Sequence, residues 1–238
     1  MFGIFTGTIV NALTVVIGTA VGCVFKGKKL KRIGERVFQG FGLFTVMLGI
    51  SGAIDLPQPL FMLASLIIGT AIGELADLDD KFNRLANWLQ SKFAKEGDTG
   101  FANGFISGTL LFCVGSMTIM GALQSGLSNQ HTIYYTKSVL DGFSACMFAM
   151  GSGMGVGFAS LAVLIYQGAL VALSSLLAPI MTEEILAVST AVGSLSVLGL
   201  GLNMLGITKL KVANFLPAMF VPIVYQIIMV LFHLGSAL

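Results

Sequence analysis

Charged side chains are scarce in this chain of 238 residues, where Asp, Glu, Lys and Arg together make up 10%. In soluble domains these four residues make up about a quarter. Hydrophobic residues make up 55%, and the mean hydropathy is +0.92. So few charges cannot cover a water-facing surface, which excludes an ordinary soluble domain and a disordered chain. We therefore expect an integral membrane protein whose partner is the lipid bilayer and which binds no nucleic acid.

Cysteine and histidine are also rare, with three and two residues. The cysteines lie in apolar stretches, which excludes a disulfide-rich secreted domain and indicates small packing residues. Neither His131 nor His233 belongs to a zinc-binding pattern. The sequence has no HExxH motif, no paired catalytic Asp motif and no Ser–His arrangement. We expect no metal, no cofactor and no enzymatic activity.

Long apolar runs dominate the rest of the sequence. A run of about twenty apolar residues crosses a bilayer as a helix, and these runs are continuous, unlike the alternating strands of a membrane barrel. The sequence therefore predicts an all-α fold with about eight transmembrane helices. They are expected at 2–25, 37–54, 59–77, 104–127, 133–151, 154–179, 185–207 and 214–234.

The basic residues predict the orientation of these spans. Twelve of the thirteen lie in the connections after the first, third and seventh spans, which share one face if the amino terminus is outside. The positive-inside rule makes that face cytoplasmic. The exception is Lys137, which lies within the fifth span. The twelve are Lys26, Lys28, Lys29, Lys31, Arg32, Arg36, Lys81, Arg84, Lys92, Lys95, Lys209 and Lys211.

The segment 78–96 has an amphipathic pattern, with apolar residues that include Trp88 on one helical stripe and charges opposite. This pattern is typical of a helix lying on the cytoplasmic leaflet. We expect residues 78–100 to form this interfacial helix and a linker that tethers two halves of the protein. A docking site for a partner is the alternative.

A weak internal repeat relates two parts of the chain. Residues 35–49 read ERVFQGFGLFTVMLG and residues 137–151 read KSVLDGFSACMFAMG, with four identities at an offset of 102. With three spans per copy, the copies cross the membrane in opposite senses, as in inverted-repeat transporters and channels. We expect one repeat at 1–77, the inverted repeat at 101–179 and two appended spans at 180–238. Span seven belonging to the second repeat is the alternative.

Three motifs suggest a family. GSMTIMGALQSG begins at residue 115, KSVLDG at residue 137 and VLIYQG at residue 163. In these motifs the chain resembles the DUF554 (YdfK/YqgA-like) family of uncharacterised bacterial inner-membrane proteins. The resemblance implies a bacterial inner-membrane location and an inverted-repeat fold, and it supplies no substrate.

Asp141 is the leading candidate for chemistry. It lies about 12 Å into the fifth span at 1.5 Å per residue, near the bilayer midplane, where a carboxylate needs a partner. Lys137, four residues earlier, lies on the same helical face. The pair is either structural or a proton or cation site that Lys137 neutralises when empty. Other polar residues at similar depth are candidates to line one cavity with it, and Gln39 is added as the repeat counterpart of Asp141. These are Asn11, Ser116, Thr118, Gln167 and Asn203.

Glycine spacing adds two expectations. The segment 115–121 either unwinds locally and frees backbone groups for a ligand or continues as an unbroken helix, which we favour. Three pairs of glycines four residues apart predict close helix approach or packing in a homodimer. The pairs are Gly3 with Gly7, Gly18 with Gly22, and Gly69 with Gly73.

These observations predict a secondary transporter of a small polar or charged solute. Coupling to a proton or another ion and alternating access around a midplane site at the repeat interface would follow from this architecture. Two alternatives stay open: an ion channel, and a scaffold or assembly subunit that transports nothing.

Overall fold

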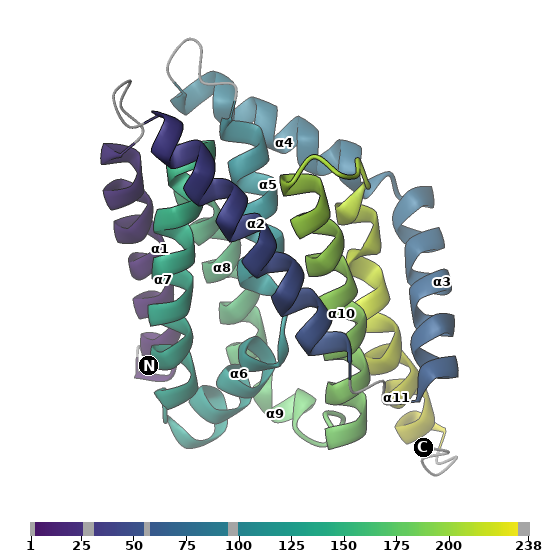
Figure 1. Ribbon diagram of the computed structural model, residues 1–238. Helices are drawn as coiled ribbons and strands as arrows, with labels where there is room; N and C mark the ends of the chain where they lie inside the picture. The colour runs from purple at the N-terminus through teal and green to yellow at the C-terminus, as the bar shows by residue number, and fades with distance from the viewer. Residues whose placement is uncertain (1–2, 26–30, 55–57, 95–99, 233–238) are drawn as a thin grey trace.

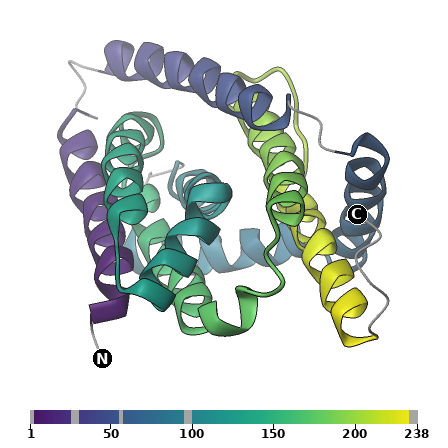
Figure 2. The same ribbon diagram turned by 90° about the horizontal axis from the view of Figure 1, so that it is seen from below.

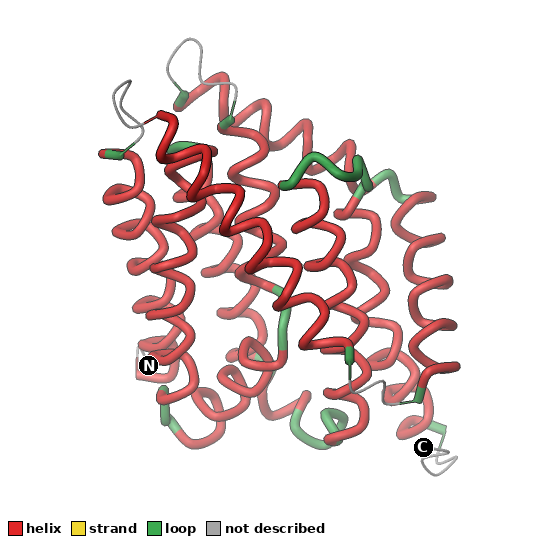
Figure 3. Tube along the Cα trace, in the orientation of Figure 1, coloured by secondary structure: helices red, strands yellow, loops and turns green. Residues whose placement is uncertain are grey.

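The computed structural model describes residues 3–25, 31–54, 58–94 and 100–232. These residues form helices and connecting turns, with no strand in the described part of the chain (Figure 3), so the all-α class is confirmed. In chain order the elements are η1 (Gly3–Phe5), α1 (Thr6–Val24), α2 (Lys31–Ala53), α3 (Pro59–Leu75), α4 (Leu78–Phe93), α5 (Phe101–Cys113), α6 (Ser116–Ser128), α7 (Thr132–Ser152), α8 (Gly155–Ala172), α9 (Ser174–Leu177), α10 (Glu183–Met204), η2 (Val212–Phe220) and α11 (Val221–Leu231).

Most of these helices match the apolar runs, but span four (104–127) does not. It was expected to be one unbroken helix, and this is wrong: α5 ends at Cys113, α6 begins at Ser116, and the two helices are bent by 62°. The run at 154–179 also divides, because α8 ends at Ala172 before the short α9. The last run begins as the 3-10 helix η2, which contains Pro217, a residue that cannot donate a backbone hydrogen bond.

Among the described residues, four helical segments are long and apolar enough to cross a membrane: η1 with α1, α8, α10, and η2 with α11. The bent pairs α3–α4 and α5–α6 raise this number to six if each counts as one span. The expected count of eight is therefore not confirmed. α2 and α7 are 23 and 21 residues long but fall outside both sets, and both contain charged residues that lower their hydropathy.

The helices pack in two groups (Figure 2). The first helix group contains α1, α5, α6, α7 and α8, in which α1 lies along α7 and α8, and α5 lies along α8. The second helix group contains α3, α10, η2 and α11, in which α3 and α10 lie along η2. Two helices connect the groups: α2 packs along α10 and also contacts α7, and α4 contacts both α5 and η2. Figure 1 shows α4 lying across one end of the bundle.

Small residues allow the close approach between α1 and α7. A Cβ atom at Gly18 would collide with the carbonyl oxygen of Gly142, and one at Gly22 with that of Cys146. In the second helix group, Gly69 and Gly73 meet the backbone of η2 in the same way. These glycines serve helix packing within the chain, the first of the two uses expected for them.

The described basic connections lie at one end of the bundle, which we call the basic end. The start of α2, the helix α4 and the loop from 205 to 211 meet there (Figure 1). They carry Arg36, Lys81, Arg84, Lys92, Lys209 and Lys211. Lys26, Lys28, Lys29 and Lys95 lie outside the described residues. The described basic connections thus share one end, as the alternation of spans expected from the sequence requires.

Candidate functional site

The charged pair at the centre of α7 is buried and joined to α1. Lys137 Nζ donates to both carboxylate oxygens of Asp141, at 3.0 Å and 2.7 Å. Asn11 Nδ2 donates to Asp141 Oδ2 at 3.0 Å. Only 7% of the Lys137 side chain and 9% of the Asp141 side chain are exposed. The one-turn spacing on a helix places the first two groups together, and the glycine contact between α1 and α7 brings Asn11 within reach.

Two apolar clusters enclose this charged pair along the helix axes. On α7, Tyr134 belongs to one cluster and Ala145 to the other, with Lys137 and Asp141 between them. On α8, Val171 and Val163 belong to the same two clusters, and Gln167 lies four residues from each, on the same face. Phe5 of η1 packs against the first of these clusters, Ala12 of α1 belongs to the second, and Asn11 lies between them in the chain. On α5 and α6, Phe112 and Ala122 enclose Thr118. We call Asn11, Thr118, Lys137, Asp141 and Gln167 the central polar layer.

Several atoms of the central polar layer lack hydrogen-bond partners among the described residues. They are Asn11 Oδ1, Thr118 Oγ1 and both amide atoms of Gln167, and all three side chains have no exposed surface. Buried polar groups in native proteins are paired with protein or water in roughly 90% of cases or more. The layer therefore offers hydrogen-bonding positions that a water, an ion or a solute can fill.

The break between α5 and α6 lies at the same level. Cys113, the last residue of α5, packs against the cluster on one side of the layer. Gly115 has φ +123°, a backbone conformation that glycine adopts without steric cost. A helix break leaves backbone N–H and C=O groups without helical partners. These groups add to the hydrogen-bonding capacity beside the charged pair.

The structure does not bring every predicted residue into this layer. Ser116, the first residue of α6, is half-buried at the break. Gln39 is exposed on α2, where it accepts a hydrogen bond from Arg36 Nη1 at 2.9 Å. It does not line a cavity with Asp141 as expected, because α2 meets α7 through Phe38 and Phe41 at Phe148, well beyond Asp141 along α7.

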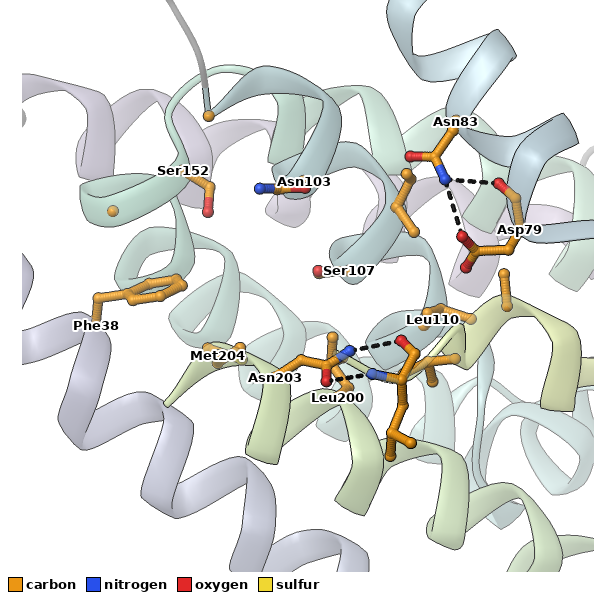
Figure 4. Close-up of a pocket in the computed structure, with 16 residues that line it drawn as sticks. Phe38, Asp79, Asn83, Asn103, Ser107, Leu110, Ser152, Leu200, Asn203 and Met204 are labelled. Atoms are coloured by element: carbon orange, nitrogen blue, oxygen red, sulfur yellow. Dashed lines mark hydrogen bonds between the residues drawn. The ribbon is translucent and has the colours of Figure 1, made fainter. Parts of the chain in front are cut away.

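A cavity of about 530 Å³ opens at the basic end, between the two helix groups. Figure 4 shows its polar residues converging from several elements: Asn103 and Ser107 from α5, Ser152 from α7, and Asp79 and Asn83 from α4. Asn203 of α10 also lines it, but its amide is fully used by the loop that follows. It donates to the Leu210 carbonyl and accepts from the Leu210 N–H and the Thr208 hydroxyl.

An apolar layer separates this cavity from the central polar layer. Leu110 and Leu200 line the cavity and pack together with Val212. Phe38, which also lines the cavity, packs against Phe148 with the rings tilted and their centroids 5.6 Å apart. Along α5, the last lining residue is three residues before Cys113, about 4.5 Å at 1.5 Å per residue. The cavity thus ends about one helical turn before the break, and the apolar layer separates it from the charged pair.

Apart from Asn203, the polar residues of the cavity were not among those predicted from the sequence. Asn103 and Ser107 are four residues apart, and therefore on one face of a helix, at the start of an apolar run. This spacing was a usable signal. Asp79 lies in the first turn of α4. It lines the cavity because α4 crosses the end of the bundle, and no local sequence pattern specifies that crossing.

Long apolar helices, buried interhelical polar contacts and an amphipathic helix across one end define the class: this is a helical membrane protein. The model of the family described as "Protein of unknown function (DUF554)" matches residues 6–227, so the chain belongs to this family and the resemblance noted from its motifs is confirmed.

Two relatives are similar over nearly their whole length. The "Uncharacterized membrane protein YdfK" of Bacillus subtilis (strain 168) is 30% identical over 220 residues, which is 91% of this chain and 93% of that protein. The "Uncharacterized protein YqgA" of Escherichia coli (strain K12) is 30% identical over 217 residues, 90% of this chain and 92% of that protein. No solved structure was found to match this chain.

Proposed function

We propose that this protein is a secondary transporter of a small polar or charged solute, coupled to a proton or another cation at Asp141. The observation that carries the proposal is the buried Lys137–Asp141–Asn11 group in a layer of unpaired polar atoms beside a broken helix. Ionisable residues inside membrane helices are costly and mark ion or substrate pathways. Broken helices at mid-membrane are where many transporters bind substrates and coupling ions.

The coupling chemistry follows from the partners of Asp141. Its carboxylate is neutralised by Lys137 and held from α1 by Asn11. A proton or cation that arrives at this carboxylate competes with the Lys137 ammonium, because two positive charges on one buried carboxylate leave an uncompensated charge in a low dielectric. The ion therefore weakens the Lys137 contact and changes the link between α1 and α7. The groups bind and couple, and we assign them no catalytic step.

Alternating access is the mechanism that fits this arrangement. The cavity is open at the basic end, and the apolar layer with Phe38 and Phe148 closes the path to Asp141. Movement of the first helix group against the second would open that layer and close the cavity. The proposal includes the inverted repeat of 1–77 and 101–179, with the basic end cytoplasmic in a bacterial inner membrane. The proposal is compatible with a homodimer.

Flux in proteoliposomes tests the proposal. The purified protein is reconstituted and uptake of a panel of labelled amines, amino acids, organic acids and sugars is measured with and without a proton or sodium gradient. We expect gradient-dependent uptake of at least one solute, and its loss in Asp141→Asn. The matched control is Asp80→Asn, which changes an exposed carboxylate on α4 and should keep wild-type uptake.

Each outcome separates the alternatives. Gradient-driven uptake that persists in Asp141→Asn would remove Asp141 from the coupling mechanism. Large passive flux that ignores the gradient would identify a channel. No flux of any solute in the panel would favour the scaffold or assembly subunit, and the transport proposal would be abandoned.

A further inference from the structure

The cavity at the basic end has the form of a ligand site. Its volume of about 530 Å³ falls within the range of roughly 300–1,000 Å³ that holds small molecules in proteins. The side chains of Asn103, Ser107 and Ser152 line it and form no hydrogen bond with another described residue. Figure 4 shows these three side chains near one another on the same side of the cavity. A solute that enters therefore meets polar groups with free hydrogen-bonding capacity.

The charge of this cavity is negative. Among its described lining residues, Asp79 is the one that ionises, and none is Lys or Arg. The Asp79 carboxylate is held in place by Asn83 Nδ2, which donates to Oδ2 at 2.9 Å, and its backbone N–H donates to Asn214 Oδ1 at 2.7 Å. These contacts are neutral, so the carboxylate has no counter-ion among the described residues.

Lys211, which lies between the lining residues Leu210 and Val212, is directed to another carboxylate. Its Nζ is 3.9 Å from Glu74 Oε1, and both side chains are largely exposed. The C-termini of α7 and α10 at Ser152 and Met204 direct partial negative charge toward the cavity, and the N-termini of α5 and α4 oppose them, with Asp79 in the first turn of α4. The full charge on Asp79 therefore decides which ligand is favoured.

We propose that this cavity binds a small solute that carries a protonated amine. The ammonium group pairs with the Asp79 carboxylate, and Asn103, Ser107 and Ser152 hydrogen-bond to the remaining polar groups of the solute. A carboxylate solute is excluded, because no positive side chain among the described lining residues compensates its charge. This inference rests on the proposed function in that it names the solute class, while its site is distinct from the ion site at Asp141.

Binding to the full-length protein in nanodiscs tests the inference without transport. Isothermal titration compares ethanolamine and 4-amino-1-butanol with their uncharged matches, ethylene glycol and 1,4-butanediol, and with succinate. We expect the two amines to bind and the diols and succinate not to. Asp79→Asn should raise the dissociation constant for the amines by at least about tenfold, since a charged hydrogen bond is replaced by a neutral one. Asp80→Asn on the exposed face should leave it unchanged.

A second variant covers the case in which Asp79→Asn disturbs α4. Ser107→Leu fills the cavity from α5 and should also abolish amine binding while the protein keeps its thermal unfolding temperature. Amines that fail to bind the wild-type protein, or that bind Asp79→Asn and Ser107→Leu as tightly, would overturn the inference.

The two proposals fail in different ways. Amine binding that depends on Asp79, without any gradient-driven uptake, overturns the transport function and keeps the site. Gradient-driven uptake of a neutral or anionic solute that depends on Asp141, with no amine binding, keeps the transport function and overturns the assignment of the cavity. Asp141→Asn itself should still bind amines, because Asp141 does not line the cavity.

Discussion

The buried ion pair on α7 makes a quantitative prediction about stability. Replacing Asp141 by Asn leaves the Lys137 ammonium without its partner in a site where 7% of its side chain is exposed. Replacing Lys137 by Met leaves the carboxylate with the Asn11 amide alone. Removing one partner of a buried pair costs about 3–5 kcal/mol, whereas replacing both by neutral groups is close to neutral. The double variant should therefore be more stable than either single variant.

A double-mutant cycle measures this coupling directly. Unfolding free energies of the wild type, Asp141→Asn, Lys137→Met and the double variant are obtained by equilibrium titration with SDS in mixed micelles, followed by far-UV circular dichroism. We expect a coupling free energy of at least about 2 kcal/mol. The matched control is the pair of Lys211 and Glu74, at 3.9 Å and with exposed side chains, for which the coupling should stay below about 1 kcal/mol.

One result would refute the reasoning. If the destabilisations of the two single variants simply add within about 0.5 kcal/mol in the double variant, the two groups do not share a buried interaction. The central polar layer would then not be the low-dielectric site that the transport proposal requires. Loss of the coupling on adding salt would lead to the same conclusion, because salt screens exposed pairs far more than buried ones.

Three further predictions address the packing of α1 on α7, the backbone conformation at Gly115 and the access of a water-soluble reagent to the cavity. Gly18→Val should destabilise the protein by about 3 kcal/mol or more, since its Cβ meets a backbone carbonyl of α7. Gly40→Ala, which adds a methyl group into open space, should change the unfolding free energy by no more than about 1 kcal/mol. Equal thermal shifts for these two variants would contradict the packing contact of Gly18. Gly115→Ala should cost about 1–3 kcal/mol, because φ +123° with ψ 155° is a conformation essentially restricted to glycine, measured in the same unfolding titration. In a variant without native cysteines, Ser107→Cys should react with a charged thiol reagent added at the basic end and Ser138→Cys should not; equal rates would refute the closed apolar layer.

The sequence predicted the local features of the fold well. The run at 133–151 corresponds to α7 (Thr132–Ser152), and the amphipathic segment at 78–96 corresponds to α4 (Leu78–Phe93). Hydrophobic periodicity and length act within one helix, so they can be read from one segment. The Lys137–Asp141 pair was predicted for the same reason, because its spacing alone places both groups on one face.

The errors involve relations between distant segments. Gln39 was placed beside Asp141 by repeat symmetry, but their helices have different neighbours: Gly40 has open space around it, while its counterpart Gly142 lies against α1. The inverted repeat itself stays a prediction. Span four was expected to be unbroken, since its apolar composition favours a continuous helix and a single glycine within it is tolerated at small cost.

By itself, the sequence determined that this is a helical membrane protein, where several of its helices lie and that one helix carries a charge pair. These properties depend on apolar content and on spacing within a helix. Only the tertiary structure decided that α5 and α6 separate at Gly115, that Asn11 reaches Asp141, and that Asp79 faces Asn103 across a cavity. These features depend on which helices pack together, and that choice is made by contacts between residues far apart in the chain.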